Sequence, residues 1–274
     1  MNTERLMAIA LEMADLTEIP GDSAIHHPGD GIERVLLGID LKQAELKIAK
    51  DLGYDCAIAH HPSAGTSILR YHEVLLRHVD QMVAAGVPEA VARETMAETI
   101  ESRRVLASMQ NYDHAPSVAK LIDLPYLNIH TPLDEVGRRR LAEVAEAFDP
   151  QRTVADLIGA LREAFGEFRS AKTQIEVRVG KKTNRLGRVV MSHGAGTNGG
   201  TPVAKAYFEH GIDTVLYIHC RPEDSKRLRE EYGDEKNLIV TGHIASDAIG
   251  INPYVERLRA EGLDVTTFSG ILPA

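Results

Sequence analysis

The 274-residue sequence predicts an α/β protein made of two similar lobes with mostly parallel sheets. Short apolar runs alternate with amphipathic helical segments, the pattern of βαβ units. Several of the apolar runs end in histidine. Segments beginning at Gly53 and at Gly211 also repeat one order: Gly-x-Asp, an apolar strand, histidine and proline. This weak internal duplication predicts a first lobe over residues 1–130 and a second, interlocking with it, over residues 131–274.

The first lobe is expected to begin with a helix that ends before Pro20-Gly21. The run RVLLGID (residues 34–40) is typical of a buried strand, and residues 41–53 of an amphipathic helix ended by a glycine. CAIAHHP (56–62) is the next strand, which completes a parallel βαβ unit. Residues 68–110 predict two helices, the second opened by Pro88, before the strand YLNIH (126–130).

The second lobe is expected to start with helices near Asp134 and after Thr153, followed by the half-exposed strand TQIEVRV. A strand then enters the glycine-rich segment SHGAGTNGG (192–200), and a helix and the strand IDTVLYIHCRP (212–222) follow. The strand NLIVTGH, a long helix through Leu258 and the strand LDVTTFSG complete this lobe.

The composition is that of an ordinary globular protein, with 43% hydrophobic and 26% charged residues. A net charge of −9 opposes nucleic-acid binding, which needs clustered positive charge. Cys56 and Cys220 both lie in apolar runs, which favours buried free thiols. The sequence lacks a signal peptide and an apolar run of the ~20 residues that span a membrane. We therefore expect a cytoplasmic protein.

The positions of the 12 histidines carry the functional information. His60, His61, His130, His219 and His243 all lie where an apolar run ends, and ligands of parallel α/β sheets collect outside the carboxyl ends of strands. In contrast, His72, His78 and His210 lie within predicted helices and are assigned to structure or surface. His26 and His27 lie in a Gly/Pro-rich loop, where exposure is expected.

Three motifs are candidates for metal binding, and each has an ordinary structural alternative. In the first, Pro62 keeps His61 extended, so that His60 and His61 point to opposite sides and can serve two ions. In the second, HTPLD (130–134), Asp134 is either a ligand with His130 as its neighbour, or part of the charge pattern at a helix start. In the third, GHIASD (242–247), His243 and Asp247 are four residues apart and share one helix face. They either bind one metal ion together or form an ordinary surface pair.

The loop SHGAGTNGG follows a strand and precedes a helix. Its backbone N–H groups could hold an anion, but the loop lacks the Lys-Ser/Thr of a P-loop and is not a GxGxxG, so the phosphate signal is weak and an ordinary tight turn is the alternative. His193 in this loop is a candidate general acid or base near the metals.

The motifs AHHP, HTPLD, GAGTNGG and GHIASD occur in an order that resembles the Nif-three-like family, also labelled type 2 GTP cyclohydrolase I. The resemblance runs from about Val35 to the C-terminus. It implies a two-lobed α/β protein that binds two metal ions per subunit between its lobes and assembles as a homohexamer. It also implies that His60, His61, Asp134 and His243 are ligands. Asp247 stands where the family usually has glutamate. Because aspartate is one methylene shorter, a bridge between two ions becomes a contact with a single metal or requires a closer helix. The segment 68–125 is longer than the family's usual connection.

Two divalent ions held by histidine and carboxylate can be Zn, Fe, Mn, Co or Ni, and would activate water for hydrolysis. We therefore expect a dinuclear metal-dependent hydrolase, GTP cyclohydrolase-like or acting on another nucleotide or heterocycle. The alternative is a non-catalytic metal-binding scaffold or adaptor. An open coordination position would distinguish the enzyme from the scaffold.

Overall fold

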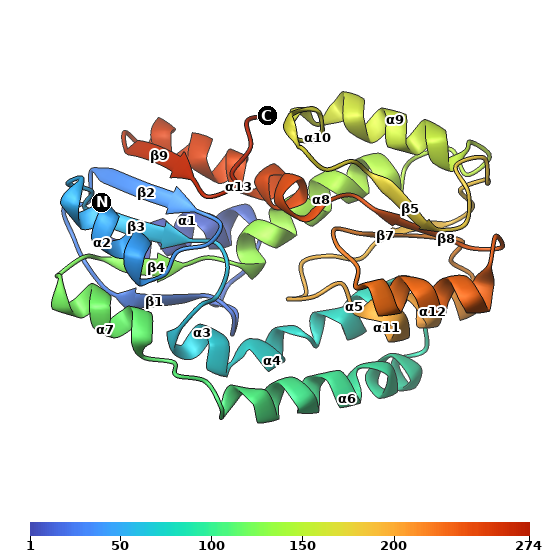
Figure 1. The fold of residues 1–274 in the computed structure, drawn as a ribbon, viewed down its shortest axis with the longest axis horizontal. Coiled ribbons are helices and arrows are strands. Elements are labelled where there is room, and N and C mark those ends of the chain that lie inside the picture. The colour runs from blue at the N-terminus through green and yellow to red at the C-terminus, as the bar shows by residue number, and fades with distance from the viewer. The chain divides into compact units, whose positions relative to one another are not determined.

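The structure is a computed structural model that describes all 274 residues. Contacts between Cα atoms divide the chain into two compact units that alternate along the sequence. Unit 1 comprises Met1–Val74, Glu101–Val136 and Gly250–Ile271, and unit 2 comprises Leu75–Ile100, Gly137–Ile249 and Leu272–Ala274. Each unit contains one sheet, and most strand pairs in both sheets are parallel, which confirms the predicted α/β class (Figure 1).

Unit 1 has a five-stranded sheet in the order β1-β4-β3-β2-β9. Its strands are β1 (Ala24–His27), β2 (Arg34–Gly38), β3 (Cys56–Ala59), β4 (Tyr126–Asn128) and β9 (Asp264–Phe268). Its helices are α1 (Thr3–Met13), α2 (Gln43–Asp51), α3 (Gly65–Leu69), α4 (Tyr71–Val74) and α7 (His114–Leu121). Three further helices have residues in both units: α6 (Glu89–Ala107), α8 (Thr131–Ala145) and α13 (His243–Ala260). Only β1 runs antiparallel, at one edge.

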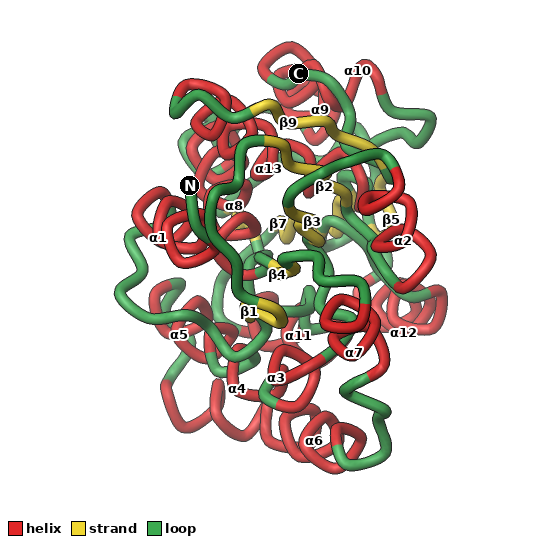
Figure 2. The backbone as a smooth tube through the Cα atoms, turned by 90° about the vertical axis from the view of Figure 1, so that its left-hand side faces the viewer, coloured by secondary structure: helices red, strands yellow, loops and turns green.

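The alternation of side chains along the strands of unit 1 gives the sheet two apolar faces. Val35 and Leu37 of β2 pack in one cluster with α1 and the C-terminal part of α13. Leu36, between them, packs in the opposite cluster with α2 and α7. Figure 2 shows the sheet edge-on, with α1 and α13 on its left and α2 and α7 on its right. The sheet is therefore the middle layer of a three-layer sandwich, and its buried strands read as continuous apolar runs.

Unit 2 has a four-stranded sheet in the order β5-β8-β7-β6. Its strands are β5 (Glu176–Val179), β6 (Val189–Met191), β7 (Thr214–Tyr217) and β8 (Asn237–Val240), and its own helices are α5 (Arg77–Ala84), α9 (Val154–Ala164), α10 (Gly166–Ser170), α11 (Gly200–Glu209) and α12 (Pro222–Tyr232). Leu216 and Ile239 pack against Leu157 and Leu161 of α9. On the alternate side of β7, the Tyr217 hydroxyl donates to Gly200 O of α11 over 2.8 Å.

The two sheets repeat one topology, as the short matching segments of sequence predict. Each begins with an antiparallel edge strand (β1 or β5) that has a register shift in its pairing. The three strands that follow along the chain lie side by side and parallel: β2, β3 and β4 in unit 1, and β6, β7 and β8 in unit 2. A helix follows the last of these three strands in each case: α8 follows β4, and α13 follows β8. Both helices carry a His-x-x-x-Asp segment at their start, with the histidine directly before α8 and as the first residue of α13.

Three expectations about elements need correction. The strand LDVTTFSG does form, as β9, but it pairs in parallel with β2 and so belongs to the sheet of unit 1. The first helix expected after residue 68 is divided into α3, α4 and α5, whereas the second, α6, does begin next to Pro88. His26 lies in β1, with its ring stacked on Tyr126 at a centroid distance of 4.8 Å. None of the helices combines the length and the apolar character that crossing a membrane requires.

Candidate metal centre

His60 follows β3, a strand with parallel neighbours on both sides, and its ring is buried. Its Nδ1 lies 3.0 Å from the carbonyl oxygen of Ile129, at the end of β4. Because a carbonyl oxygen can only accept, Nδ1 carries the proton and Nε2 presents its lone pair. This is the tautomer that a histidine needs to bind a metal through Nε2.

His61 is oriented in the same way by a carboxylate. Its Nδ1 lies 2.9 Å from Asp40 Oδ1, and 23% of its side chain is exposed. Asp40 follows β2, the neighbour of β3, so parallel pairing places the carboxylate next to the paired histidines. The rings of His60 and His61 are 5.1 Å apart between centroids.

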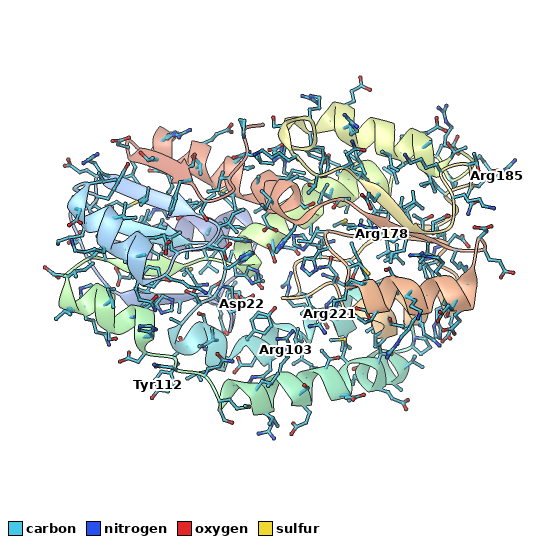
Figure 3. The ribbon with its side chains drawn as sticks, in the orientation of Figure 1. Asp22, Arg103, Tyr112, Arg178, Arg185 and Arg221 are labelled. Atoms are coloured by element: carbon cyan, nitrogen blue, oxygen red, sulfur yellow. The ribbon has the colours of Figure 1, made fainter.

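The His130 ring is oriented by Asp22, a carboxylate that is more buried than Asp40. His130 Nδ1 lies 2.6 Å from Asp22 Oδ2, and the same oxygen accepts a hydrogen bond from Thr131 Oγ1 over 2.7 Å. Ser23 Oγ accepts from the backbone N–H of His130 over 2.9 Å. The two residues before β1 therefore fix both the ring and the backbone of His130 (Asp22 is labelled in Figure 3).

Asp134 lies in the first turn of α8, four residues after His130, and is 4% exposed. Its Oδ1 lies 3.2 Å from His60 Nε2, and its Oδ2 lies 3.5 Å from His130 Nε2. A lone pair on His60 Nε2 and an ionised carboxylate repel one another at this distance unless a proton or a metal cation lies between them. Ring nitrogens of His60, His61 and His130 also lie within 4.8 Å of one another. The residues of unit 1 therefore fit a transition-metal ion by type, orientation and spacing.

Unit 2 places His243 and Asp247 on one face at the start of α13. His243 Nε2 lies 3.3 Å from Asp247 Oδ2, and Asp247 is 2% exposed whereas the His243 side chain is 43% exposed. Gly242, with φ of +107°, makes the turn from β8 into the helix, and Gly242 O accepts from Ser246 Oγ over 2.7 Å. The predicted one-face arrangement of this pair is what the structure contains.

The repeated topology makes the histidines of the two units equivalent in pairs. His219 follows β7 as His60 follows β3, and His243 starts α13 as His130 precedes α8. The ring centroids of His219 and His243 are 4.6 Å apart, and those of His60 and His130 are 4.9 Å apart. Each unit thus carries the same histidine pair with an aspartate four residues beyond its second member.

The glycine-rich loop belongs to unit 2, and α5 holds its backbone there. Arg77 Nε donates to Gly194 O over 2.7 Å, and Gln81 Nε2 donates to His193 O over 2.5 Å. His193 is 3% exposed as a residue. The loop is also joined to β7, because Asn198 Oδ1 accepts from the N–H of Ile218 over 2.7 Å.

The start of α11, where an anion could have bound, already has a carboxylate. Thr201 donates to Asp224 Oδ1 through its N–H over 3.1 Å and through its hydroxyl over 2.7 Å. Asp224 lies in the first turn of α12. The protein's own side chain therefore caps this helix, and the tight-turn interpretation of the loop describes it better than a phosphate cradle.

The sequence did not identify Asp22 or Asp40 and gave His130 only as a neighbour of Asp134. Asp40 had a usable signal, since it ends a predicted strand beside the strand that carries His60. Asp22 had none, because its partners His130 and Thr131 lie more than 100 residues away.

Comparisons with known proteins find solved structures that share this fold. A crystal structure of a NIF3 superfamily protein from Sphaerobacter thermophilus is 48% identical, covers 98% of both chains and has a TM-score of 0.94. No family model and no curated protein matches this chain.

More distant solved structures share the fold. Reduced HcgD from Methanocaldococcus jannaschii is 15% identical, covers 97% of both chains and has a TM-score of 0.59. A structural-genomics protein named ybgI, described as of unknown function, is 16% identical, covers 98% of both chains and has a TM-score of 0.56. At these identities the likeness concerns the fold alone.

Proposed function

This chain belongs to the NIF3 superfamily, and on that premise we propose that it is a dinuclear metal-dependent hydrolase with a small, nucleotide-like or heterocyclic substrate. The ligands in this proposal are His60, His61 and Asp134 of unit 1, to which the structure adds His130, and His243 and Asp247 of unit 2. The ions are two divalent transition metals per subunit. GTP is the first substrate to test, because the sequence resembles a family labelled as a cyclohydrolase.

One observation carries the proposal. Three histidines of unit 1 each have Nδ1 next to an oxygen acceptor: Ile129 O, Asp40 Oδ1 and Asp22 Oδ2. Each ring therefore directs a lone pair on Nε2 away from its acceptor. Surface histidines have no reason to share this arrangement, whereas metal-binding histidines nearly always have such a partner.

Histidine and carboxylate ligands suit Zn, Fe, Mn, Co or Ni. When bound, two such ions supply an activated water and stabilise negative charge on a carbonyl or phosphoryl oxygen. His193 is retained as the candidate general acid or base, because it lies in the loop that follows β6. Its test is a loss of kcat in His193→Gln with the metal content unchanged.

We also propose that the protein acts as a homo-oligomer, a hexamer by resemblance to its family. Several large apolar side chains of unit 1 are exposed, among them Met109 at 75% and Leu121 at 85%. Because single exposed apolar residues are common on protein surfaces, the proposal of an oligomer rests on the resemblance to the family. Light scattering coupled to size-exclusion chromatography measures the mass directly.

The experiment that tests the metal centre is elemental mass spectrometry on untagged protein purified without added metal. We expect close to two transition-metal ions per wild-type subunit and fewer in His60→Ala and in Asp247→Ala. His114→Ala, at an exposed helix start, is the control and should keep the wild-type content. Wild-type protein that stays metal-free after reconstitution would contradict the proposal. Two ions with no turnover of any nucleotide would favour the scaffold alternative.

A further inference from the structure

The connection between β3 and β4 contains more helices than the repeated topology requires. In unit 2 the equivalent connection, residues 218–236 between β7 and β8, contains the single helix α12. The connection between β3 and β4, residues 60–125, contains α3 to α6 in addition to α7, and its residues 75–100 belong to unit 2. One helix is enough to return a parallel strand, so the crossover itself does not require the added helices. Tyr71 of α4 makes a ring contact with His130, and Arg103 of α6 lies over the Tyr71 ring.

Tyr71 is the residue of the pair next to His130. Its ring centroid lies 6.4 Å from that of His130, with 24° between the ring planes. The phenol hydroxyl of Tyr71 is a hydrogen-bond donor.

Arg103 brings a permanent positive charge to the same place. The Arg103 Cζ atom lies 5.8 Å from the centroid of the Tyr71 ring. The neighbouring arginines of α6 are arranged differently: Arg93 pairs with Glu89, and Arg104 pairs with Glu101, both on the exposed face of their own helix. Arg103 and Asp22 are both labelled in Figure 3, with Arg103 below Asp22 in that view.

The backbone around Tyr71 is held tightly against the segment that carries Asp22. A Cβ atom on Gly21 would lie 2.5 Å from the carbonyl oxygen of Arg70, so only glycine allows this approach. A Cβ atom on Gly65, at the start of α3, would lie 2.5 Å from His26 Nδ1. Tyr71 is thus held at a fixed position relative to Asp22 and His130, as a preorganised binding group should be.

We infer that Tyr71 and Arg103 bind an oxyanion group of the substrate, a phosphate or a carboxylate, beside the histidine cluster. The phenol O–H and the guanidinium N–H groups are both donors, and a guanidinium binds such groups in two-pronged geometry. The inference rests on the proposed function, which it deepens by giving the substrate an anionic group. A purely structural cation–π contact between the two residues is the alternative.

Calorimetric titration of inorganic phosphate into the metal-loaded protein tests the inference. We expect Arg103→Ala to raise the Kd for phosphate at least 10-fold and Tyr71→Phe to raise it several-fold. Arg104→Ala removes the adjacent charge from an exposed pair and should stay within 2-fold of wild type. Arg103→Met, which keeps the apolar stem over Tyr71, replaces the alanine variant if that one does not fold.

Metal content, measured on the same samples, keeps this test separate from that of the proposed function. A metal-free wild type would contradict the hydrolase proposal, while the ratio of Kd values between Arg103→Ala and Arg104→Ala would still report on the oxyanion site. A wild type that does not bind phosphate overturns the inference. So does an unchanged Kd in Arg103→Ala with a lowered Tm, which is the result expected of a structural contact.

Discussion

The Asp22 carboxylate and the His130 imidazole lie 2.6 Å apart, Oδ2 to Nδ1, and both side chains are buried in unit 1. A carboxylate in this position fixes the ring, selects the tautomer and makes Nε2 more basic. It is also the link between the start of β1 and the end of β4, two segments that are remote in sequence but paired in the sheet.

The first prediction concerns Asp22. Asp22→Asn removes the negative charge behind His130 with little change in volume, so we expect metal affinity to fall about 10- to 100-fold. Competition with a chromophoric chelator measures the affinity. Asp30→Asn, in the exposed loop after β1, is the matched control, and an equal loss in both variants would contradict the assignment.

The second prediction concerns Asp247, which is almost fully buried. Asp247→Asn should lower metal affinity strongly, because a neutral amide is a poor ligand for a divalent ion. The Tm of the metal-free protein should not fall, since the substitution removes a buried charge that costs free energy of desolvation. Calorimetric scans with and without metal separate the two effects, and Asp264→Asn at the exposed start of β9 serves as the reference. A lower Tm in the absence of metal would indicate a structural role instead.

The third prediction concerns the pH dependence of stability. Burial lowers the pKa of His78 to about 4 in the folded chain, against an ordinary value of 6.5. Above pH 6.5 the ring is neutral in both states and contributes no pH dependence. As the pH falls below 6.5 the unfolded chain takes up the proton first, so the free energy of unfolding decreases until about pH 4.

His78→Gln should therefore reduce the loss of stability between pH 7 and pH 5 by about 2 kcal/mol. The glutamine can keep the contact that His78 Nε2 makes with Thr197 Oγ1. Urea unfolding at the two pH values measures the difference, and the exposed His114→Gln is the control. Equal acid sensitivity in wild type and His78→Gln would show that His78 does not titrate in this way.

The fourth prediction separates backbone strain from steric overlap at two glycines of unit 1. Gly31 and Gly65 have similar φ values, +66° and +58°. A Cβ on Gly31 meets nothing within 4 Å, whereas one on Gly65 would overlap the His26 ring. Gly31→Ala should lower the free energy of unfolding by about 1–2 kcal/mol, because alanine is strained in the left-handed region. Gly65→Ala should lower the free energy of unfolding by about 1–3 kcal/mol more than Gly31→Ala does, because the His26 ring must move. Urea titration measures both free energies of unfolding. Equal losses in the two variants would show that the His26 ring does not lie against Gly65.

The sequence predicted those parts of the site that depend on local patterns. An apolar run that ends in His60-His61 is visible because β3 is buried on both faces and reads as continuous apolar residues. The spacing of His243 and Asp247 is visible because residues four apart share a helix face. In both cases the information lies within a single element.

What the sequence did not predict depends on strand pairing between remote segments. Asp22 reaches His130 only because β1 pairs antiparallel with β4, and nothing near Asp22 specifies that pairing. The assignment of β9 failed for the same reason, since a strand carries no local signal of which sheet it joins. The break of the first helix after residue 68 into α3, α4 and α5 likewise follows from packing, which propensity alone does not encode.

The position of β9 has a consequence for how the chain acquires its structure. Residues 264–268 pair with residues 34–38, so the sheet of unit 1 stays one strand short until residue 268 has left the ribosome. During synthesis β2 presents an unpaired edge of apolar residues, which invites pairing with the strands of other nascent chains. A loop closed over so many residues also slows the last step of folding. We therefore expect unit 2, whose sheet is built from residues 176–240, to become protease-resistant on the ribosome before unit 1 does.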